Sequence, residues 1–373
     1  MALVMGMNSG SSFDGIDVVL IETDLAPDGH PVCPRFIDSL THAWPEAVAT
    51  QVLRAFANEL SIFALCRLNY TVGAVYAEAA RRLLDQRALD PAAVAAIGVD
   101  GQTIYQEPPD RAGMRALPPN ASLVERWLDG PYPCGLQIGE PSLIAAHTEI
   151  TTVSQFRPAD HAVGGTGAPL MQYLDFVAFR DSGPVLTLNI GGIANCPYAH
   201  PDRARMRAFD TGPGNVMLDH AARRLYGLSH DPDGRLAAAG TVDEGMLAHL
   251  LAHPFFARRP PRSAWRLDFG AAYADSVLDA YAGLRPDDIM ATLCAFTATS
   301  IVRAIAEHIP DAAGLDVVIA SGGGVRNAHL MQMLRALARP PAPDHLRRVR
   351  YPGAVQGGHQ VRHARLRHAQ QRG

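Results

Sequence analysis

A short segment in the middle of the chain places a guanidinium, a carboxylate and an imidazole directly before a run of glycines. It reads Phe156-Arg-Pro-Ala-Asp-His-Ala-Val-Gly-Gly-Thr-Gly167, with Arg157, Asp160 and His161 ahead of residues 164–167. A carboxylate beside backbone without side chains can act as a general base on a ligand that approaches the main chain closely. An ordinary strand, turn and helix with a capping aspartate would have the same composition. The segment thus predicts Asp160 as a base and leaves a structural role open.

The elements that would position Asp160 follow from the neighbouring pattern. A short apolar strand is expected to end in a polar turn that holds Arg157 and Asp160. Ala168 and Pro169 are expected to open an apolar helix, because proline is tolerated in a first turn, where its missing N–H has no helical partner. Asp160 would then lie between the strand and the flexible glycines.

Length and composition favour a soluble globular protein of two domains. The 373 residues exceed the ~250–300 at which a single core usually stops growing. Apolar residues make up 48% and the formal net charge is −4, which gives no sign of a nucleic-acid partner. No apolar run approaches the ~20 residues of a membrane span. We expect domains at residues 1–137, rejoined by part of 350–373, and at 138–349.

The cysteines indicate a reducing compartment. They are five in number, scattered, and never spaced as Cys-x-x-Cys. The start of the chain has neither the basic residues nor the long apolar stretch of a signal peptide. Reduced thiols in the cytoplasm are therefore expected.

Two hairpin tips could hold phosphate groups. Residues 8–15 connect two predicted strands, and Gly191-Gly192 connects two more. Tips rich in backbone N–H groups and hydroxyls can surround phosphate oxygens, and Asp14 or Asp17 could hold Mg²⁺ through water. Plain hairpin turns use the same residues. The repeated layout predicts two related halves.

Three further polar turns follow predicted buried strands, at residues 100–104, 210–215 and 321–327. Ligands of open α/β sheets usually lie at such strand ends. The last two turns precede predicted helices, whose free N–H groups favour anions. None of them is a P-loop or a G-x-G-x-x-G fingerprint. Their number, more than any one of them, indicates a nucleotide site.

Taken together, these segments make the chain resemble the anhydro-N-acetylmuramic acid kinase family, including the related levoglucosan kinases. The resemblance covers residues 4 to about 338. The matching segments occur in one order: Met7–Asp17, Asp100–Ile104, Phe156–Asp160, Gly164–Leu170, Asn189–Asn195, Phe209–Asn215, Thr297–Ile301 and Ser321–Asn327. Asn8 is similar to the residue of the levoglucosan kinases at this position.

The resemblance implies the fold of sugar kinases, heat-shock ATPases and actin, a ribonuclease H-like fold with a central cleft between two α/β domains. It implies ATP with Mg²⁺ and a small 1,6-anhydro sugar, with no nucleic acid, no membrane and a possible homodimer. Asp160 matches the family's general base, and Arg157 would orient it or the sugar. Water deprotonated by Asp160 would attack C1, and the released O6 would take the γ-phosphoryl group.

The remaining site residues are carried over by position. The nucleotide is expected to contact Gly10, Ser11, Ser12, Phe13, Asp14, Gly15, Ile16, Asp17, Asn189, Gly191, Gly192, Asn195, Asp210, Gly212, Gly214, Asn215, Gly322, Gly323, Gly324 and Asn327. The sugar is expected to contact Asp100, Gln102, Thr103, Gly165 and Gly167, and the metal Asp14.

Several positions depart from the family pattern. The family usually has His at Asp100, Asp at Gln155, and Gly and Glu at Trp265 and Leu267. These departures affect the identity of the sugar more than the phosphoryl transfer. From Tyr351 the chain lacks the family's final apolar helix, and a frameshift or a genuine disordered tail would each explain this.

Three functions therefore compete. The first is an ATP-dependent kinase of a 1,6-anhydro sugar, with anhydro-N-acetylmuramic acid as the expected substrate. The second is a levoglucosan kinase or another sugar kinase of the same fold. The third is a catalytically impaired homologue that binds nucleotide or sugar. Retention of Asp14, Asp160 and the glycine turns argues against the third.

Overall fold

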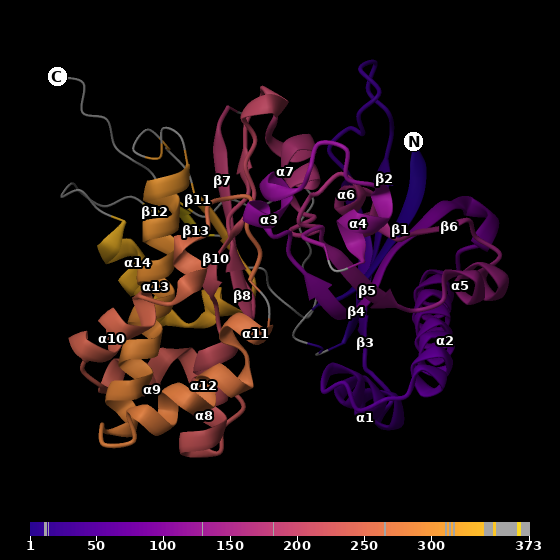
Figure 1. The fold of residues 1–373 in the computed structure, drawn as a ribbon. Coiled ribbons are helices and arrows are strands. Elements are labelled where there is room, and N and C mark those ends of the chain that lie inside the picture. Colours follow the sequence, from indigo (N-terminus) through magenta and orange to yellow (C-terminus); the bar gives the residue numbers. More distant parts are fainter. Residues whose placement is uncertain are drawn as a thin grey trace. The chain divides into compact units, whose positions relative to one another are not determined.

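A computed structural model describes residues 1–10, 13, 15–128, 130–181, 183–264, 266–309, 312, 315, 318–338, 346–347 and 364–366 (Figure 1). Met1–Gly167 forms one compact unit, and the described residues from Ala168 onward form the second. The predicted cleft between two domains stays a prediction. Trp265 and most of the tail from Tyr351 lie outside the described residues, and so does the hypothesis about the tail.

The first unit is built on a mixed six-stranded sheet. Its order is β3-β2-β1-β4-β5, with β6 also paired to β4. The first three strands form an antiparallel meander, and β4 runs parallel to β1. The strands are β1 (Ala2–Ser9), β2 (Ile16–Thr23), β3 (Arg35–His42), β4 (Val94–Glu107), β5 (Cys134–Ile138) and β6 (Thr152–Ser154).

The long helix α2 contributes more buried residues to the core of this unit than any other single element. The helices of the first unit are α1 (Glu46–Phe56), α2 (Ile62–Arg87), α3 (Arg111–Ala116), α4 (Leu123–Trp127), α5 (Pro141–Thr148) and α6 (Phe156–Ala162). The Ser61 side chain caps the start of α2, and the helix ends at Ala88 in the left-handed conformation. Val72, Tyr76 and Leu83 lie on the buried face of α2. Their helical spacing, visible in the sequence, fixes which face packs on the sheet.

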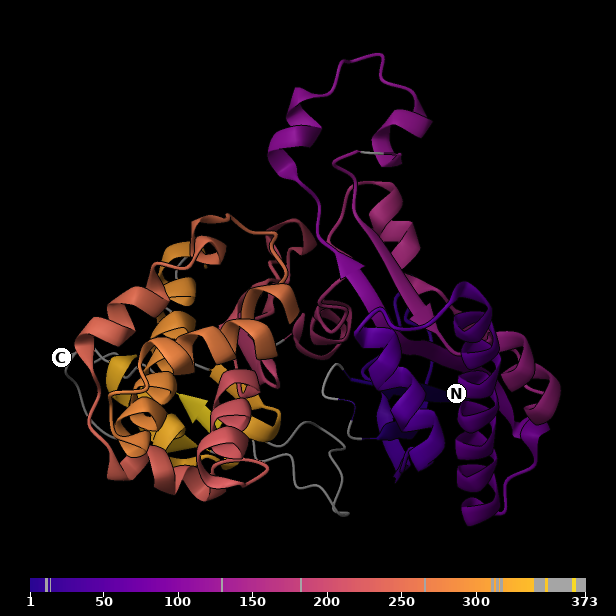
Figure 2. The same ribbon diagram turned by 60° about the horizontal axis from the view of Figure 1, so that its bottom comes forward.

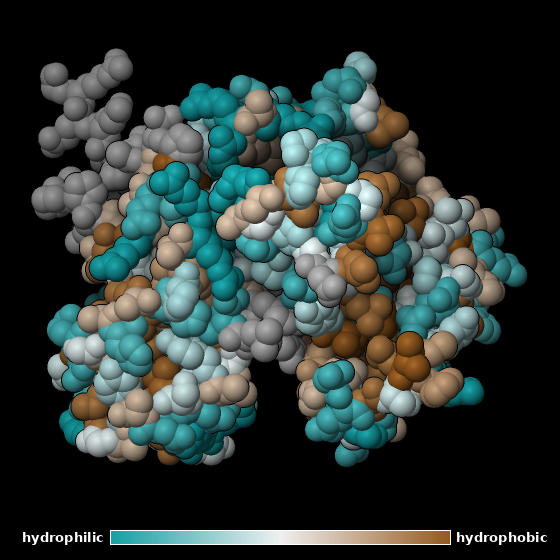
Figure 3. All heavy atoms as spheres, in the orientation of Figure 1, coloured by the Kyte–Doolittle hydropathy of each residue, from teal (hydrophilic) through white to brown (hydrophobic). Residues whose placement is uncertain are grey.

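Short helices replace part of a predicted loop. The Pro and Gly of residues 111–136 predict a loop and a short hairpin within this segment. The structure instead has α3 and α4 there, beyond the end of the antiparallel pair that β4 and β5 form (Figure 2). A capping box of Ser122 and Glu125 starts α4. Leu123, Val124 and Leu128 are exposed there, and Figure 3 shows hydrophobic residues gathered on the visible face of this unit.

The second unit repeats the strand order of the first. Its sheet has the order β10-β8-β7-β11-β13-β12, with β9 also on β7. As in the first unit, a hairpin and a further antiparallel strand precede a strand parallel to the first, β11. The strands are β7 (Val185–Ile190), β8 (Ile193–Asn195), β9 (Tyr198–Ala199), β10 (Asp210–Pro213), β11 (Val318–Ser321), β12 (Leu346–Arg347) and β13 (Ala364–Leu366). The predicted two related halves and the α/β fold class are confirmed.

Helices cover this sheet and bury its core. They are α7 (Gln172–Phe179), α8 (Val216–Tyr226), α9 (Arg235–Ala239), α10 (Glu244–Leu251), α11 (Arg266–Phe269), α12 (Ala271–Ala280), α13 (Pro286–His308) and α14 (Ala328–Leu337). Short 3₁₀ turns occur at Pro91–Ala93, Arg203–Arg205, Pro232–Gly234, Pro254–Ala257 and Gly323–Arg326. Among the described helices, α13 alone has the length and apolar composition of a membrane span, and 72% of that window is buried in the unit, as in a core helix.

Three local predictions are corrected. The turn expected to hold Arg157 and Asp160 is the helix α6. The helix expected to open at Pro169 begins at Gln172 instead. The turn at 100–104 is part of β4, because pairing with β5 continues the strand to Glu107.

Two boundaries also differ from expectation. The turn predicted to begin at Asp210 is the strand β10, which pairs with β8. The units divide between Gly167 and Ala168, not between residues 137 and 138. Residues 138–167 belong to the first unit because β6 pairs with β4, and because α5 and α6 pack on α2 and β5. Of the tail expected to rejoin the first domain, Ala364–Leu366 pairs with β11 of the second sheet.

Candidate active site

Asp160 lies on the last turn of α6 with its carboxylate held at one oxygen only. The backbone N–H of Gly167 donates to Asp160 Oδ2 at 2.7 Å, and the N–H of Gly165 donates to the Asp160 carbonyl at 2.7 Å. The side chain is exposed. No described residue donates a hydrogen bond to Oδ1. A carboxylate fixed at one oxygen and free at the other has the geometry of a general base.

The glycines after α6 are explained by what packs against them. A Cβ on Gly165 would overlap the Asp160 carboxylate. A Cβ on Gly167, whose φ is +66°, would overlap the His161 ring. Only glycine allows the loop to wrap this closely around the two side chains. Contact of Gly165 and Gly167 with a sugar stays a prediction.

His161 is buried and faces Gln106 on β4. The Gln106 Nε2 lies 3.0 Å from His161 Nε2 and also donates to the Thr166 carbonyl at 2.8 Å. His161 Nε2 therefore accepts a hydrogen bond, which places the proton of a neutral ring on Nδ1. Burial lowers the pKa of His161. His161 thus supports the loop as a neutral ring.

Buried amides without partners surround this region. The Oε1 atoms of Gln102 and Gln106, and both amide atoms of Gln137, have no hydrogen-bond partner among the described residues. The three side chains are buried, and a buried amide left unpaired costs about 1–3 kcal/mol. Such groups are typical of sites completed by a ligand or by water. Sequence reasoning named Gln102 but missed Gln106 and Gln137, since a glutamine in a strand carries no signal by itself.

Arg157 is paired with Asp100, which lies on β4. The Arg157 Nε–Asp100 Oδ1 distance is 3.1 Å, and the Arg157 Nη2–Asp100 Oδ2 distance is 2.6 Å. The two side chains are only 16% and 13% exposed. Both carboxylate oxygens of Asp100, expected to face the sugar, are thus engaged by the guanidinium. Thr103 is buried on the same strand.

Ser11, Ser12 and Asp14 of the first hairpin tip lie outside the described residues, and its other residues have structural partners. The N–H of Phe13 donates to the Gly10 carbonyl, and the Phe13 ring packs on Trp44 and Phe56. Asp17 accepts from Thr41 Oγ1 at 2.7 Å, and Ile16 is fully buried. A Cβ on Gly15 would lie 2.6 Å from Thr41 Cγ2. Ser9 pairs with Gln102 across β1 and β4, so the tip begins beside the buried amides.

Three predicted nucleotide turns meet in the second unit. The N–H groups of Gly214 and Asn215 donate to the carbonyls of Gly192 and Gly191, both at 2.8 Å. Asn215 Nδ2 donates to the Gly191 carbonyl at 3.1 Å. A Cβ on Gly322 would lie 2.6 Å from Asn189 Oδ1. The turns at 191–192, 212–215 and 322–324 are therefore adjacent, as the sequence predicted.

The glycines of these turns divide into two groups. Added Cβ atoms on Gly214 and Gly324 would overlap the Gly191 carbonyl and the Ile190 side chain, so packing requires glycine there. At Gly192 and Gly323 the nearest atoms would be 3.9 and 3.8 Å away. At Gly191 the nearest would be 3.5 Å away, an ordinary contact. A methyl group at these three glycines would make only ordinary contacts, so packing does not require glycine there.

Asp210, Gly212, Asn327 and Asn195 are integrated into the fold. Asp210 is buried, and its Oδ2 accepts from the N–H of Ala264 at 2.7 Å. Gly212 has a φ of +149°, and a Cβ there would be 3.0 Å from Ser300 Oγ. Asn327 caps α14 by accepting from the N–H of Leu330 at 2.9 Å, and Asn195 is paired with Asn189 across β7 and β8. Their described contacts support the site without showing a ligand role.

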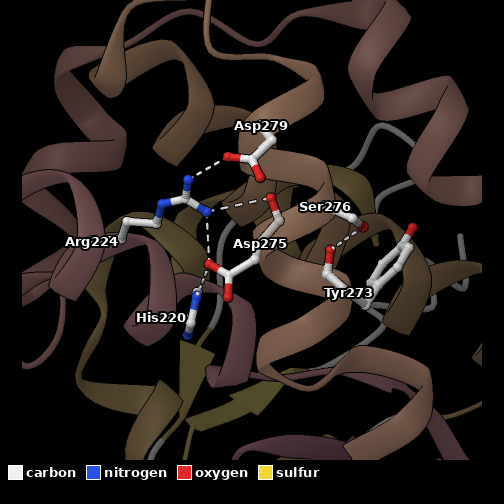
Figure 4. A network of polar contacts seen from close by, with 6 residues as sticks. All are labelled: His220, Arg224, Tyr273, Asp275, Ser276 and Asp279. Carbon is white, nitrogen blue, oxygen red and sulfur yellow. Dashed lines mark hydrogen bonds and ion pairs between the residues drawn. The ribbon is translucent and has the colours of Figure 1, made fainter.

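A polar network fixes α8, the helix that follows the Asn215 turn. Figure 4 shows His220 and Arg224 of α8 facing Asp275 and Asp279 of α12. His220 Nε2 and Arg224 Nη1 lie 2.8 and 2.7 Å from Asp275 Oδ1, and Arg224 also pairs with Asp279. Hydrogen bonds from His220 and Arg224 lower the pKa of Asp275. The network joins α8 to α12.

Comparisons with known proteins identify the family of this chain. Residues 2–126 and 112–340 match the profile of the family Anhydro-N-acetylmuramic acid kinase. The Anhydro-N-acetylmuramic acid kinase of Salinibacter ruber is 37% identical over 351 residues, 90% of this chain and 82% of that protein. The protein of that name from Francisella tularensis subsp. novicida is 35% identical over 338 residues, 89% of this chain and 84% of that protein.

Among solved structures, a ROK family glucokinase from Streptomyces griseus is similar at 14% identity and a TM-score of 0.36, over 91% of this chain and 93% of that chain. The profile match spans most of the described residues, including α6 and the glycine turns. Relatives at 35–37% identity cover nearly nine-tenths of the chain or more. The chain belongs to the anhydro-N-acetylmuramic acid kinase family.

Proposed function

We propose that the protein is an ATP-dependent kinase that opens the 1,6-anhydro bridge of anhydro-N-acetylmuramic acid and phosphorylates O6. The observation that carries this proposal is the Asp160 carboxylate, exposed and fixed at Oδ2 by the Gly167 N–H. Membership of the family and the names of the relatives supply the substrate class.

Asp160 performs the proton transfer in this mechanism. Its free Oδ1 takes a proton from water, the water oxygen bonds to C1, and the C1–O6 bond breaks. The electron pair left on O6 attacks the γ-phosphorus of ATP, and the bond to the β-phosphate oxygen breaks to release ADP. The reaction needs positioning and charge neutralisation more than covalent help from the protein.

The glycine turns of the second unit fit the nucleotide. Glycine at positions 191, 192 and 323 is not required by packing, and its lack of a side chain allows phosphate or ribose oxygens to approach the backbone. The first turn of α8 adds N–H groups and the positive end of a helix dipole. Mg²⁺ would neutralise charge on the phosphates. It needs only one or two carboxylates besides them, and the described residues contain no group of three possible metal ligands.

The buried amides of Gln102, Gln106 and Gln137 fit the sugar. Their unpaired atoms lie on β4 and β5 beside α6. A sugar hydroxyl or acetamido group can donate to and accept from them. We propose that they complete the sugar site, together with Thr103 and the loop at Gly165 and Gly167.

Release of ADP tests the substrate. We expect turnover with anhydro-N-acetylmuramic acid, less with levoglucosan, and none with glucose. A preference for levoglucosan or for plain hexoses would favour the second candidate function, and no turnover with any sugar would favour the impaired homologue.

The variant Asp160→Asn tests the base. It is expected to lower kcat by roughly 10²–10⁴-fold, since an amide cannot accept the proton. Asp85→Asn, on the exposed side of α2, is the matched control and is expected to leave kcat unchanged. Undiminished turnover of Asp160→Asn would remove Asp160 from the mechanism.

A further inference from the structure

We infer that Asp100 is a positioning residue that holds Arg157 away from Asp160 and so preserves the basicity of the Asp160 carboxylate. This inference rests on the proposed function, in which Asp160 is the base. It concerns a residue that the sequence assigned to sugar binding.

The geometry of α6 makes this separation necessary. Arg157 and Asp160 are three residues apart on one helix, a spacing at which opposite charges become neighbours and pair. The structure instead directs the guanidinium to Asp100 on β4, through two hydrogen bonds at 3.1 and 2.6 Å. No described hydrogen bond or ion pair joins Arg157 to Asp160. Arg157 thus pairs with Asp100 and not with Asp160, the acidic residue three positions later on α6.

The pairing also has an electrostatic consequence. An unpaired guanidinium within about 4–6 Å of a carboxylate lowers the carboxylate pKa by roughly 1–3 units and makes it a weaker base. The Asp100 carboxylate neutralises Arg157 where both side chains are less than one-fifth exposed, so solvent screens the pair only weakly. The group near Asp160 is therefore an ion pair without net charge and not an unpaired cation.

The other titratable groups around α6 do not replace this effect. His161 is buried and accepts a hydrogen bond at Nε2, and burial lowers its pKa, which disfavours the charged ring. On β5, the Cys134 thiol donates to Glu107, and burial raises its pKa. Tyr132 approaches the loop at Gly164. The pair of Arg157 and Asp100 is thus the ion pair beside α6 that a single substitution leaves unbalanced.

Two single variants should shift the pH dependence in opposite directions. Asp100→Asn leaves Arg157 charged and free to turn toward Asp160, so the acid limb of the kcat–pH profile should move down by about one pH unit and plateau kcat should fall roughly tenfold. Arg157→Gln leaves an unpaired carboxylate at Asp100, so the limb should move up. The double variant should return the limb to the position of the unaltered protein. Asp100→Glu, which keeps the carboxylate, should leave the limb in place.

A titration of the Asp160 carboxyl carbon by ¹³C NMR supplies a second measurement that requires no turnover. It should show the same two opposed shifts, in variants whose thermal unfolding confirms that they fold. If both single variants lose activity without opposed shifts, Asp100 only stabilises α6 and the inference is wrong. Failure of the proposed function is distinct, because it appears as turnover retained by Asp160→Asn, whatever Asp100 does.

Discussion

Asp219 is a half-buried carboxylate in the first turn of α8, close in sequence to the Asn215 turn. Burial raises its pKa to about 6, although nearby Arg223 and His230 act in the opposite direction. No described residue donates a hydrogen bond to its side chain. Most other buried carboxylates of the unit have such partners, as Asp210 and Asp231 do. A carboxylate that the fold leaves unpaired weakens the folded state whenever it is ionised.

The variant Asp219→Asn should therefore stabilise the protein at neutral pH. The folded-state pKa lies above the ordinary value of 3.8. Between these two values the folded state binds more protons than the unfolded state, so stability falls as pH rises and stays lower above pH 6. We expect a gain of about 1–2 kcal/mol at pH 8, after allowance for partial exposure, and little change near pH 4.

Urea unfolding at both pH values measures this, with Asp85→Asn as the control. Equal stability of Asp219→Asn and the unaltered protein at pH 8 would mean that solvent or a ligand already satisfies the carboxylate. Loss of nucleotide affinity in the same variant would show that Asp219 is retained for binding.

Among the elements, the glycine turns of the second unit contain glycines that packing requires and glycines that it does not require. Gly214→Ala should lower the stability of the unit by more than about 2 kcal/mol, since its Cβ would overlap the Gly191 carbonyl and backbone must move. Gly323→Ala would add only an ordinary contact with Asn215 Nδ2 at 3.8 Å, so stability should be unchanged. Because the proposed nucleotide lies there, Gly323→Ala should raise the KM for ATP several-fold.

Thermal unfolding and initial rates at varied ATP separate these two effects. A Gly323→Ala protein with an unaltered KM would move the nucleotide away from this turn. An unchanged unfolding temperature for Gly214→Ala would contradict the packing at Gly191.

The sequence predicted the strand and helix order well because apolar periodicity is local. Apolar periodicity predicts helices over residues 67–88, 216–225 and 289–308, where the structure has α2, α8 and α13. The three glycine turns of the second unit lie together, as their place at strand ends predicts. The sequence patterns missed the extension of β4 beyond Val99, because pairing with β5 depends on a partner some 30 residues away, at a bulge that no local pattern records.

The predictions that failed near the site also failed because the structure there depends on features that local sequence patterns do not record. Pro and Gly between residues 111 and 136 concealed α3 and α4, which are too short for a clear period. The partners of Arg157 and His161, namely Asp100 and Gln106, lie more than 50 residues earlier in the chain. Sequence patterns name the residue types that do chemistry, but the contacts that tune them are tertiary.

For the molecule as a whole, each unit has a separate hydrophobic core. The core of the first is centred on α2, and that of the second on α13. We therefore expect two unfolding transitions in calorimetry. Leu83→Ala and Leu293→Ala truncate matched buried leucines of the two cores. Each should lower the temperature of a different transition, because it lowers the free energy of unfolding of one unit by about 2–5 kcal/mol.

Binding of ATP provides an internal check on that assignment. Bound ATP should raise the temperature of the transition that Leu293→Ala lowers, because a ligand stabilises the part of the protein that binds it. A single transition shifted equally by both variants would show that the two cores unfold as one.

At the tip formed by Gly191 and Gly192, the residue that would give the higher stability differs from the residue that leaves the backbone accessible to a ligand. Neither residue has a positive φ, and neither lacks room for a methyl group. Alanine at such a position generally stabilises a protein by about 0.4–1 kcal/mol, because it restricts the unfolded chain. Alanine would thus stabilise the fold more than glycine does, so packing does not explain the two glycines, whereas the proposed approach of a phosphate to this backbone would.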